Sequence, residues 1–270
     1  MYRIFMTEML RLVQEDRMLR PYEEVIERRH EAALRKEREF AGEGRRLSDA
    51  CNSYLYYGLH WMGDGWVFRE WAPRATAIYL LGEFNDWRKH PGYALSRVDG
   101  ESWEIRLPAE TLSHGSLYRL LVEWDGGWGE RLPSHGRRMV QDEYTKAFSA
   151  QVWRPERPYV PRNPALGKTA HPLIYEAHAG MCTEHRRVAT FQEFEVFVLP
   201  RVVDLGYNTI QLMAVQEHPY YGSFGYQVAN FFAVSSRFGT PDELKALIDA
   251  AHGMGVRVIM DIVQSHAVRN

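Results

Sequence analysis

The last third of the chain alternates short apolar segments with segments that begin like helices, and this order limits the possible folds. Apolar stretches at 173–175, 209–213 and 256–263 predict three buried strands. Thr190–Glu193 and Thr240–Glu243 each place a glutamate three residues after a threonine, which is the capping box that opens a helix. Two helices between three strands predict a βαβαβ unit with parallel strands and right-handed crossovers. A closed (β/α)8 barrel needs about 250 residues, so this region supplies only its first part.

Upstream of this region the hydrophobic pattern has a period of two. Residues 66–70, 103–107 and 118–124 alternate large apolar side chains with other residues, as half-buried strands do. Turn signals lie between these stretches, for example at Asp99-Gly100 and at 125–127. Short strands at this spacing predict a β-sandwich of about 100 residues.

The chain therefore divides into four predicted segments. Residues 1–50 form a charged helical arm, residues 51–153 the sandwich, and residues 173–270 the incomplete barrel. The stretch 154–172 is rich in proline, which excludes regular helix and predicts an extended linker. The predicted fold is thus multidomain: a helical arm, an all-β sandwich and the first βαβαβ part of a (β/α)8 barrel.

Composition narrows the classes of partner. The net charge is -2, with 33 basic and 35 acidic residues, which gives no electrostatic reason to bind nucleic acid or an anionic membrane. No apolar run approaches the ~20 residues of a membrane helix, and the first 17 residues are unlike a signal or transit peptide. Cys51 and Cys182 stand alone, which favours a cytoplasmic location. Eight Trp and 15 Tyr suit a neutral ligand such as a sugar.

Asp261 and His266 are the candidate site residues of the third predicted strand. Asp261 shares a face with Ile259 and Val263 in an otherwise apolar strand, so we expect a hydrogen-bond donor close to its carboxylate. Parallel α/β folds place their sites at the carboxyl ends of strands, which favours a site role. The alternatives are that Asp261 only anchors a neighbouring loop and that His266 is a hydrogen-bonded loop residue.

Two further sets of aromatic residues are candidates for ligand contacts. The loop from Gln216 to Gln227 is long and contains Tyr220, Tyr221, Phe224 and Tyr226 between glycines, and long ordered loops are usually functional. These rings either contact a ligand or pack the loop against the barrel. In the sandwich, Trp87 and Trp128 follow turns, where they either bind a ligand or complete a core. No phosphate loop, serine nucleophile elbow or metal-ligand cluster is recognisable, so we expect no cofactor and no metal.

These segments resemble a known family. FREWAPRATAIYLLGEFNDW, at 68–87, resembles the sugar-binding sandwich that precedes the barrel in enzymes acting on starch and glycogen. LIYEAHAG, LGYNTIQLMAVQEHPYYGSFGYQVANFF and IMDIVQSHA resemble the start of the α-amylase-superfamily barrel in 1,4-α-glucan branching enzymes of the eukaryotic type. The helical arm and the stretch RLPSHGRRMVQDEYTKAFSAQVW are similar to the same group. Gln264 stands where the family's first barrel signature usually has histidine.

The resemblance implies roles for six residues. His266 would contact the sugar in the cleavage subsite, Asp261 would brace the active-site network, and Tyr226, with Gln227 beside it, would stack on that sugar. Trp87 and Trp128 would bind glucan in the sandwich. The partner implied is α-1,4-glucan, as in glycogen, amylose or starch, with no cofactor.

The family's reaction is retaining double displacement, in which an aspartate attacks the anomeric carbon and a glutamate protonates the leaving oxygen. The resemblance implies that these carboxylates come from later strands, so no catalytic residue is expected among the 270 residues and we expect the chain alone to be inactive. Three interpretations stay open: the N-terminal part of a branching enzyme, a non-catalytic glucan-binding protein, or part of a debranching or hydrolytic relative.

Overall fold

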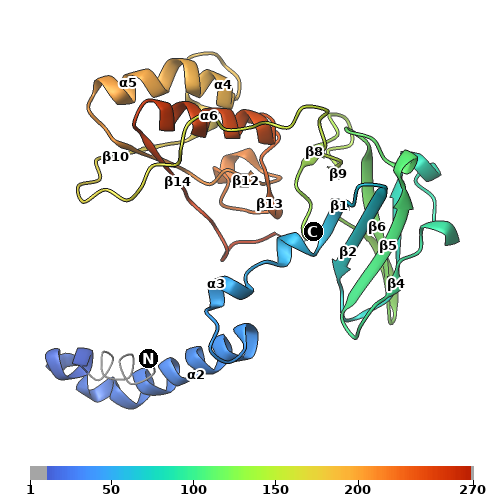
Figure 1. Cartoon of the computed structure of the whole chain (residues 1–270), viewed down its shortest axis with the longest axis horizontal. Coiled ribbons are helices and arrows are strands. Elements are labelled where there is room, and N and C mark those ends of the chain that lie inside the picture. The colour runs from blue at the N-terminus through green and yellow to red at the C-terminus, as the bar shows by residue number, and fades with distance from the viewer. Residues whose placement is uncertain (1–10, 269–270) are drawn as a thin grey trace. The chain divides into compact units, whose positions relative to one another are not determined.

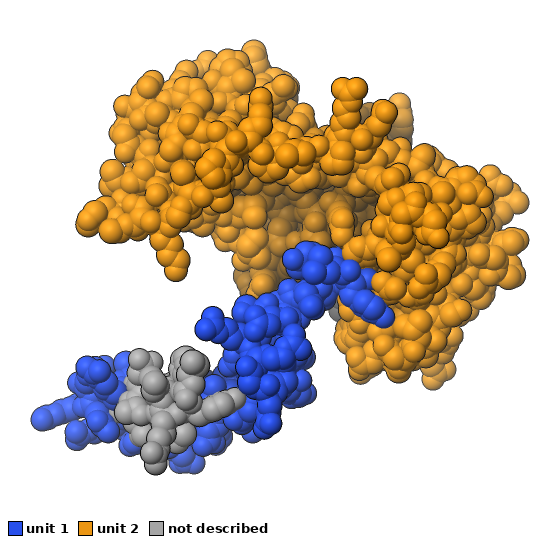
Figure 2. Space-filling view, viewed as in Figure 1, with its two compact units in different colours: residues 1–56 blue, residues 57–270 orange. Residues whose placement is uncertain are grey.

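The computed structural model describes residues 11–268 and divides the chain into two compact units, 1–56 and 57–270 (Figures 1 and 2). The first ten residues, which we interpret as unlike a targeting peptide, lie outside the described residues, as do the last two. The second unit contains both the β-rich region and the strand-helix region.

The first unit is helical. It contains the 3₁₀ segment Arg17–Tyr22, helix α2 (Glu23–Ala41), the short helix α3 (Leu47–Ala50) and a 3₁₀ turn at Ser53–Leu55. Within α2 only Ala41 is buried in this structure. A charged helix with a thin apolar stripe leaves most of its side chains in water, as the sequence predicts.

The β-rich region consists of two antiparallel sheets. One has the order β1-β2-β5-β4 and comprises β1 (Gly58–Trp61), β2 (Gly65–Trp71), β5 (Ser102–Pro108) and β4 (Ser96–Arg97). The other has the order β3-β6-β9-β8, with β7 also paired to β6. Its strands are β3 (Ala75–Gly82), β6 (Leu117–Trp124), β7 (Gly127–Arg131), β8 (Met139–Gln141) and β9 (Phe148–Gln151).

One hydrophobic core joins the two sheets. Phe68 from β2, Ile78 from β3 and Leu120 from β6 are among its fully buried side chains. The rings of Phe68 and Tyr118 meet edge to face with centroids 6.0 Å apart. The period-two pattern therefore sends alternate side chains inward from both sheets, which confirms the predicted sandwich.

The strand-helix region has a three-stranded parallel sheet of order β10-β11-β14, formed by Ile174–Ala177, Thr209–Leu212 and Arg257–Met260. Between β10 and β11 the chain forms α4 (Phe191–Glu193), a π-helical turn (Phe194–Val198) and α5 (Leu199–Asp204). Helix α6 (Pro241–Gly253) connects β11 to β14 after the short strands β12 (Gln216–Glu217) and β13 (Asn230–Val234).

Both predicted capping boxes are present. The Glu193 amide donates to Thr190 Oγ1 at 3.2 Å, and the Thr190 amide donates to Glu193 Oε2 at 2.9 Å. At α6 the Glu243 amide donates to Thr240 Oγ1 at 3.2 Å, and the Thr240 amide donates back to Glu243 Oε2 at 2.6 Å. Each box satisfies amides that the first helical turn leaves without partners, which explains why both helices begin where the sequence predicts.

The strands of this sheet are shorter and less buried than the sequence predicts. The third strand ends at Met260, not at Val263, so Asp261 lies just beyond it. Side chains of the outer strands β10 and β14 are also exposed, including Ile174 and Ile259. The helices and their core cover one face of the sheet, and in the described part of the chain no strand pairs with the free edges of β10 or β14.

The stretch 154–172 contains no helix or strand, as predicted, but it is fixed to α6. Buried Asp249 of α6 accepts hydrogen bonds from the Tyr159 hydroxyl at 2.6 Å and from the Asn163 amide at 2.8 Å. The Tyr159 hydrogen bond, with the backbone amide of Arg162, holds the pKa of Asp249 far below its ordinary value. Hydrogen bonds to Asp249 thus hold the linker against α6.

Candidate functional site

The loop between β12 and β13 carries the predicted tyrosine. Gly225 has φ of +88°, and a Cβ atom there would overlap the carbonyl oxygen of Ala214, so only glycine fits this close approach. Tyr226 follows directly and packs beside the small cluster of Ala214, Val228 and Val263. The glycine therefore brings the tyrosine across the carboxyl end of the parallel sheet.

Tyr226 and Asp261 meet at this end of the sheet. The Tyr226 hydroxyl donates to Asp261 Oδ2 at 2.6 Å, which supplies the donor that the sequence predicts for this carboxylate. The hydrogen bond to the carboxylate raises the pKa of Tyr226 to about 12, so the hydroxyl keeps its proton at neutral pH. Asp261 is partly exposed, and its backbone amide donates to the Leu212 carbonyl at 3.0 Å.

Buried Gln216 is a site-positioning residue that our sequence analysis missed. Its Oε1 accepts from the Val263 amide at 3.1 Å, and its Nε2 donates to the Phe231 carbonyl at 3.1 Å. One side chain thus joins the segment after Asp261 to β13, at the base of the Tyr226 loop. A polar residue that directly follows an apolar strand was the available sequence signal.

A second missed group lies on β10. Glu176 Oε1 accepts from Gln211 Nε2 at 2.9 Å, and the register pairs Glu176 with Gln211 and Gln211 with Ile259. Asp261 lies two residues beyond Ile259 on the same alternation, and Glu176 adds to the charge that raises the pKa of Tyr226. The end of the sheet therefore holds two carboxylates, each with a hydrogen-bond donor.

Gln227 and His266 are exposed in this structure. The Gln227 amide lies 3.4 Å from Ser223 Oγ, and His266 Nδ1 lies 2.7 Å from Ser265 Oγ. Within residues 11–268 no hydrogen bond joins His266 to Asp261 or Tyr226. The structure therefore joins Tyr226 to Asp261 by a hydrogen bond but does not join the predicted pair Asp261 and His266.

The other loop aromatics differ in what they contact. The rings of Tyr221 and Phe224 meet buried His178 edge to face, with centroids 5.8 Å and 5.5 Å away, and the Tyr221 hydroxyl donates to the Gly180 carbonyl at 3.2 Å. Both residues therefore pack the loop. Tyr220 is exposed.

The sandwich touches this loop through β13. Buried Asn230 Nδ2 donates to the Pro133 carbonyl at 2.9 Å, and the Phe232 ring stacks on His135 with centroids 4.3 Å apart. Arg138 Nη1 donates to the Gly239 carbonyl at 2.6 Å. The segment that carries Tyr226 is thus anchored to the sandwich as well as to the parallel sheet.

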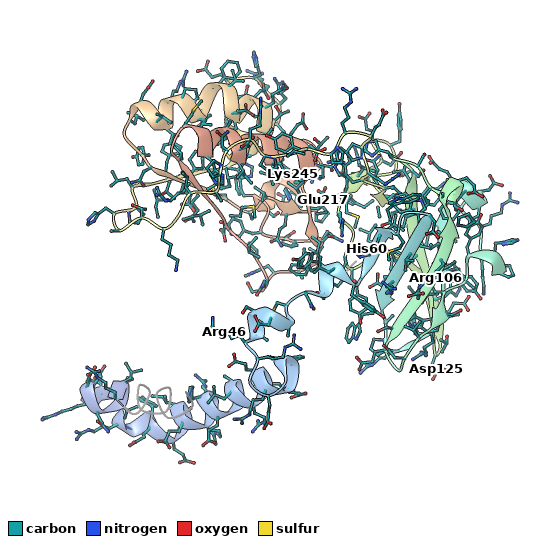
Figure 3. All side chains as sticks on the ribbon, in the orientation of Figure 1. Arg46, His60, Arg106, Asp125, Glu217 and Lys245 are labelled. Carbon is teal, nitrogen blue, oxygen red and sulfur yellow. The ribbon has the colours of Figure 1, made fainter. Side chains whose placement is uncertain are left out.

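Glu217 of β12, labelled in Figure 3, lies next to these contacts with the sandwich and is fully buried. Its carboxylate accepts from the Ser236 amide at 2.7 Å and lies 3.7 Å from Arg237 Nη1. Burial raises the pKa of Glu217, while the amides and Arg237 oppose that change. Arg237 also donates to the carbonyls of His218 and Pro219 and to Gln141 of the sandwich.

The two candidate tryptophans of the sandwich lie on the outer face of the β3-β6-β7 region. Trp128 of β7 is 69% exposed and pairs with Glu123 of β6. Trp87 is partly exposed, has φ of +58°, and lies under the guanidinium of Arg119, 5.2 Å from the ring centroid. Arg119 and Glu123 occupy the same face of β6 because they are four residues apart in a strand. Neither tryptophan belongs to the sandwich core.

Among residues 11–268 no group of three or more His, Cys, Asp or Glu side chains is arranged to hold a metal ion. No helix in that range is long and apolar enough to cross a membrane.

Family models match both halves of the second unit. Residues 56–144 match carbohydrate-binding module 48, the isoamylase N-terminal domain, and residues 198–270 match the alpha amylase catalytic domain. A 1,4-alpha-glucan-branching enzyme of Dictyostelium discoideum is 41% identical over 98% of this chain, and one of Yarrowia lipolytica is 41% identical over 97%. The chain is homologous to 1,4-alpha-glucan-branching enzymes. A branching enzyme of Felis catus is 35% identical over 97% of the chain.

The chain spans about 40% of the length of these relatives. Among solved structures, a pullulanase of Paenibacillus barengoltzii covers 79% of the chain with a TM-score of 0.64, and the chain covers 39% of it at 20% identity. A pullulanase of Bacillus subtilis covers 76% with a TM-score of 0.59, and the chain covers 32% of it at 20% identity. These likenesses support the fold of a sandwich followed by the start of a parallel α/β barrel.

Proposed function

We propose that this chain is the N-terminal, glucan-recognising part of a 1,4-α-glucan branching enzyme that acts in the cytoplasm and forms α-1,6 branches in glycogen or starch. The observation that carries this proposal is 41% identity to branching enzymes over nearly the whole chain, including both the sandwich and the barrel segment. The pullulanase likeness rests on fold alone and gives a debranching activity no comparable support.

In this proposal the Tyr226–Asp261 pair forms one wall of the subsite for the sugar whose bond is broken. The hydrogen bond fixes the tyrosine ring at the end of the sheet, where its face can stack on a sugar ring. His266 and Gln227 supply further polar contacts to that sugar, and their exposure leaves them accessible to it. Gln216 is a positioning residue that holds the two segments together.

We further propose that the 270-residue chain alone neither branches nor hydrolyses glucan. A retaining mechanism needs a carboxylate nucleophile and a second carboxyl group that donates a proton about 5 Å away. Asp261 and Glu176 are the carboxylates at this end of the sheet, and both are engaged in hydrogen bonds that suit positioning.

A branch-linkage assay on the purified chain tests this, with a full-length branching enzyme as positive control. We expect no α-1,6 linkages above background. Reproducible branching that Asp261→Asn or Glu176→Gln abolishes would instead assign those carboxylates to catalysis.

The Tyr226 role is tested in the complete enzyme. Tyr226→Phe keeps the stacking face but loses the hydroxyl, and Tyr226→Ala loses both. Because the ring is at the site and not in the barrel core, we expect Tyr226→Ala to lower turnover by ~10-fold or more and Tyr226→Phe by less, with melting temperatures close to the parent. A large fall in melting temperature with full turnover would make Tyr226 a packing residue.

Glucan binding by the sandwich is the second candidate function, and the exposure of Trp128 favours it. Affinity electrophoresis in glycogen compares Trp87→Ala and Trp128→Ala with Tyr144→Ala, a control that removes an exposed ring elsewhere on the sandwich. We expect each tryptophan variant to lose more than ~1 kcal/mol of binding free energy, as at an aromatic hot spot. Equal retardation of all variants would remove this face from the binding surface.

A further inference from the structure

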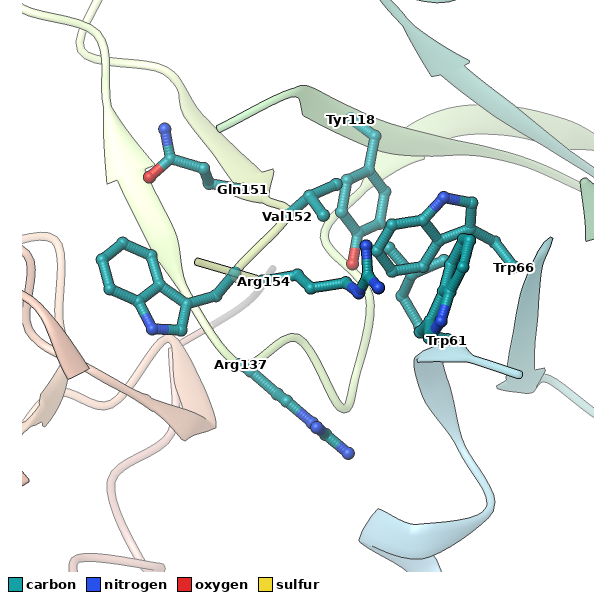
Figure 4. Close-up of a pocket in the computed structure, with 9 residues that line it drawn as sticks. Trp61, Trp66, Tyr118, Arg137, Gln151, Val152 and Arg154 are labelled. Atoms are coloured by element: carbon teal, nitrogen blue, oxygen red, sulfur yellow. The ribbon is translucent and has the colours of Figure 1, made fainter. Parts of the chain in front are cut away.

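A cavity in the sandwich lies apart from both candidate glucan sites. It has a volume of about 150 Å³ and is lined by residues of β1, β2, β6 and the segments next to β8 and β9 (Figure 4). The lining residues used below are Trp61, Trp66, Tyr118, Arg137 and Arg154. We call it the Arg137–Arg154 pocket.

Arg154 is held against an aromatic wall. Its guanidinium carbon lies 4.0 Å from the Trp61 ring centroid and 5.8 Å from that of Trp66, and Figure 4 shows the side chain extending toward both rings. The two indoles meet edge to face, 5.1 Å apart. A guanidinium stacked through its face still presents N–H donors along its edge. Stacking also restricts the side-chain conformations of Arg154, so binding a ligand costs less conformational entropy.

Arg137 adds a second cation. It lines the same cavity, and its charge acts on the buried Tyr118 hydroxyl and on His60, whose pKa is lowered by burial and by Arg137. Its contact with His60 is a long one, Nη2 to Nδ1 at 3.4 Å. Within residues 11–268 neither Arg137 nor Arg154 forms an ion pair with a carboxylate.

The pocket offers donors and few acceptors. No aspartate or glutamate lines it. Gln151 Oε1 already accepts from Arg138, and Gln151 Nε2 donates to the Gly115 carbonyl. A neutral sugar needs acceptors for its hydroxyl protons, whereas an oxyanion needs only donors and positive charge.

We propose that the Arg137–Arg154 pocket binds a phosphate monoester carried on a sugar ring. The two guanidinium groups pair with the phosphate, whose oxygens are strong acceptors and whose charge is close to -2 at neutral pH. Trp61, the partly exposed indole of the lining, is the aromatic surface that can contact the sugar ring. The source of the monoester is either a free sugar phosphate or a phosphorylated glucosyl unit of a glucan.

Titration calorimetry on the 270-residue chain at low salt tests the proposal with glucose 6-phosphate as the probe. We expect saturable binding that weakens as salt rises, because charge pairing contributes much of it. Glucose and inorganic phosphate should each bind at least 10-fold more weakly. Equal binding of glucose would overturn the anion assignment, and equal binding of inorganic phosphate would overturn the sugar assignment.

Variants locate the site. Arg154→Gln and Arg137→Gln should each weaken glucose 6-phosphate binding at least 10-fold, whereas Arg157→Gln, an exposed arginine outside the pocket, should leave it unchanged. Both arginines are exposed, but Arg154 lies against the Trp61 ring and its removal can disturb that contact, so Arg137 gives the cleaner test. Unchanged affinity in both pocket variants would overturn the proposal.

A second probe, a maltotriose phosphorylated at one 6-hydroxyl, separates the two sources. Tighter binding of this probe than of glucose 6-phosphate assigns the pocket to phosphorylated glucan, and the reverse assigns it to a free sugar phosphate. Failure of both probes to bind would overturn the site. Neither readout depends on branching activity, so the proposed function can fail or hold independently.

Discussion

In the sandwich two sheets face each other and enclose Phe68, Ile78 and Leu120, whereas the parallel sheet is covered by helices on one face and leaves Ile174 and Ile259 exposed. Both regions contain similar apolar strands. The difference is whether a second layer lies opposite, because a sheet face gains hydrophobic stabilisation only when something covers it. We therefore expect the sandwich to contribute most of the stability of the second unit.

The largest expected difference between the two regions is in the stability lost when an apolar side chain is truncated. Phe68→Ala should lower the free energy of unfolding by about 3–5 kcal/mol, because it leaves a cavity in a packed core. Ile259→Ala, which removes a side chain that is 42% exposed, should cost less than ~1 kcal/mol. Urea unfolding measures both. Similar costs would show that the parallel sheet is covered in solution by a layer the structure does not contain.

A second test uses the buried carboxylates of the two regions. Glu70 in the sandwich accepts hydrogen bonds from Ser134 and from the Trp71 amide but forms no ion pair within residues 11–268, and burial raises its pKa to about 7. Glu217 has Arg237 at 3.7 Å. The two sites thus compare a buried carboxylate with and without an ion-pair partner.

The folded-state pKa of Glu70 lies above its ordinary value of 4.5, so the folded state binds this proton more tightly. Its contribution to stability is fully present below pH 4.5 and is lost as pH rises to about 7, by roughly 3 kcal/mol at most. Glu70→Gln should flatten this slope in unfolding free energy measured from pH 4.5 to 8. An unchanged slope would assign the pH dependence to another group.

The smallest of these effects concerns the contact between the two regions. Asn230→Ala leaves the Pro133 carbonyl without its donor and should cost about 1–3 kcal/mol. Because Asn230 joins the Tyr226 loop to the sandwich, we expect the variant to unfold in two resolved steps instead of one. Gln227→Ala, an exposed neighbour, is the control and should change neither value. A single unchanged transition in Asn230→Ala would show that this hydrogen bond does not couple the regions.

Much of the fold was predictable because its signals are local. The period-two pattern around Phe68 and Trp103 predicts strands with alternate buried side chains, and the capping boxes at Thr190 and Thr240 fix where two helices begin. The parallel order of the three strands follows from the connections between them. Asp261 was a candidate because it lies in an apolar strand, and Tyr226 because it lies in a long aromatic loop, whereas the family resemblance supplied only their roles. A donor near Asp261 was expected, but the sequence did not identify it as Tyr226.

The end of the third strand was predicted three residues too far along the chain. Ile262 and Val263 are apolar and extend the pattern beyond Asp261, but the strand ends at Met260. Beyond it the Asp261 amide still donates to the Leu212 carbonyl, and the Val263 amide bonds to the side chain of Gln216 and not to a neighbouring strand. Sequence pattern records hydrophobicity and carries no information about which partner each amide finds.

The sequence by itself determined the types of element in this protein, their order, and the residues that most deserve testing. Only the tertiary structure decided that Gln216 joins two loops, that Asn230 and Arg138 anchor the barrel segment to the sandwich, and that Arg137 and Arg154 share a pocket. The physical reason is distance along the chain. Helix caps and strand periodicity arise between residues a few positions apart, whereas these contacts join residues that only folding brings together.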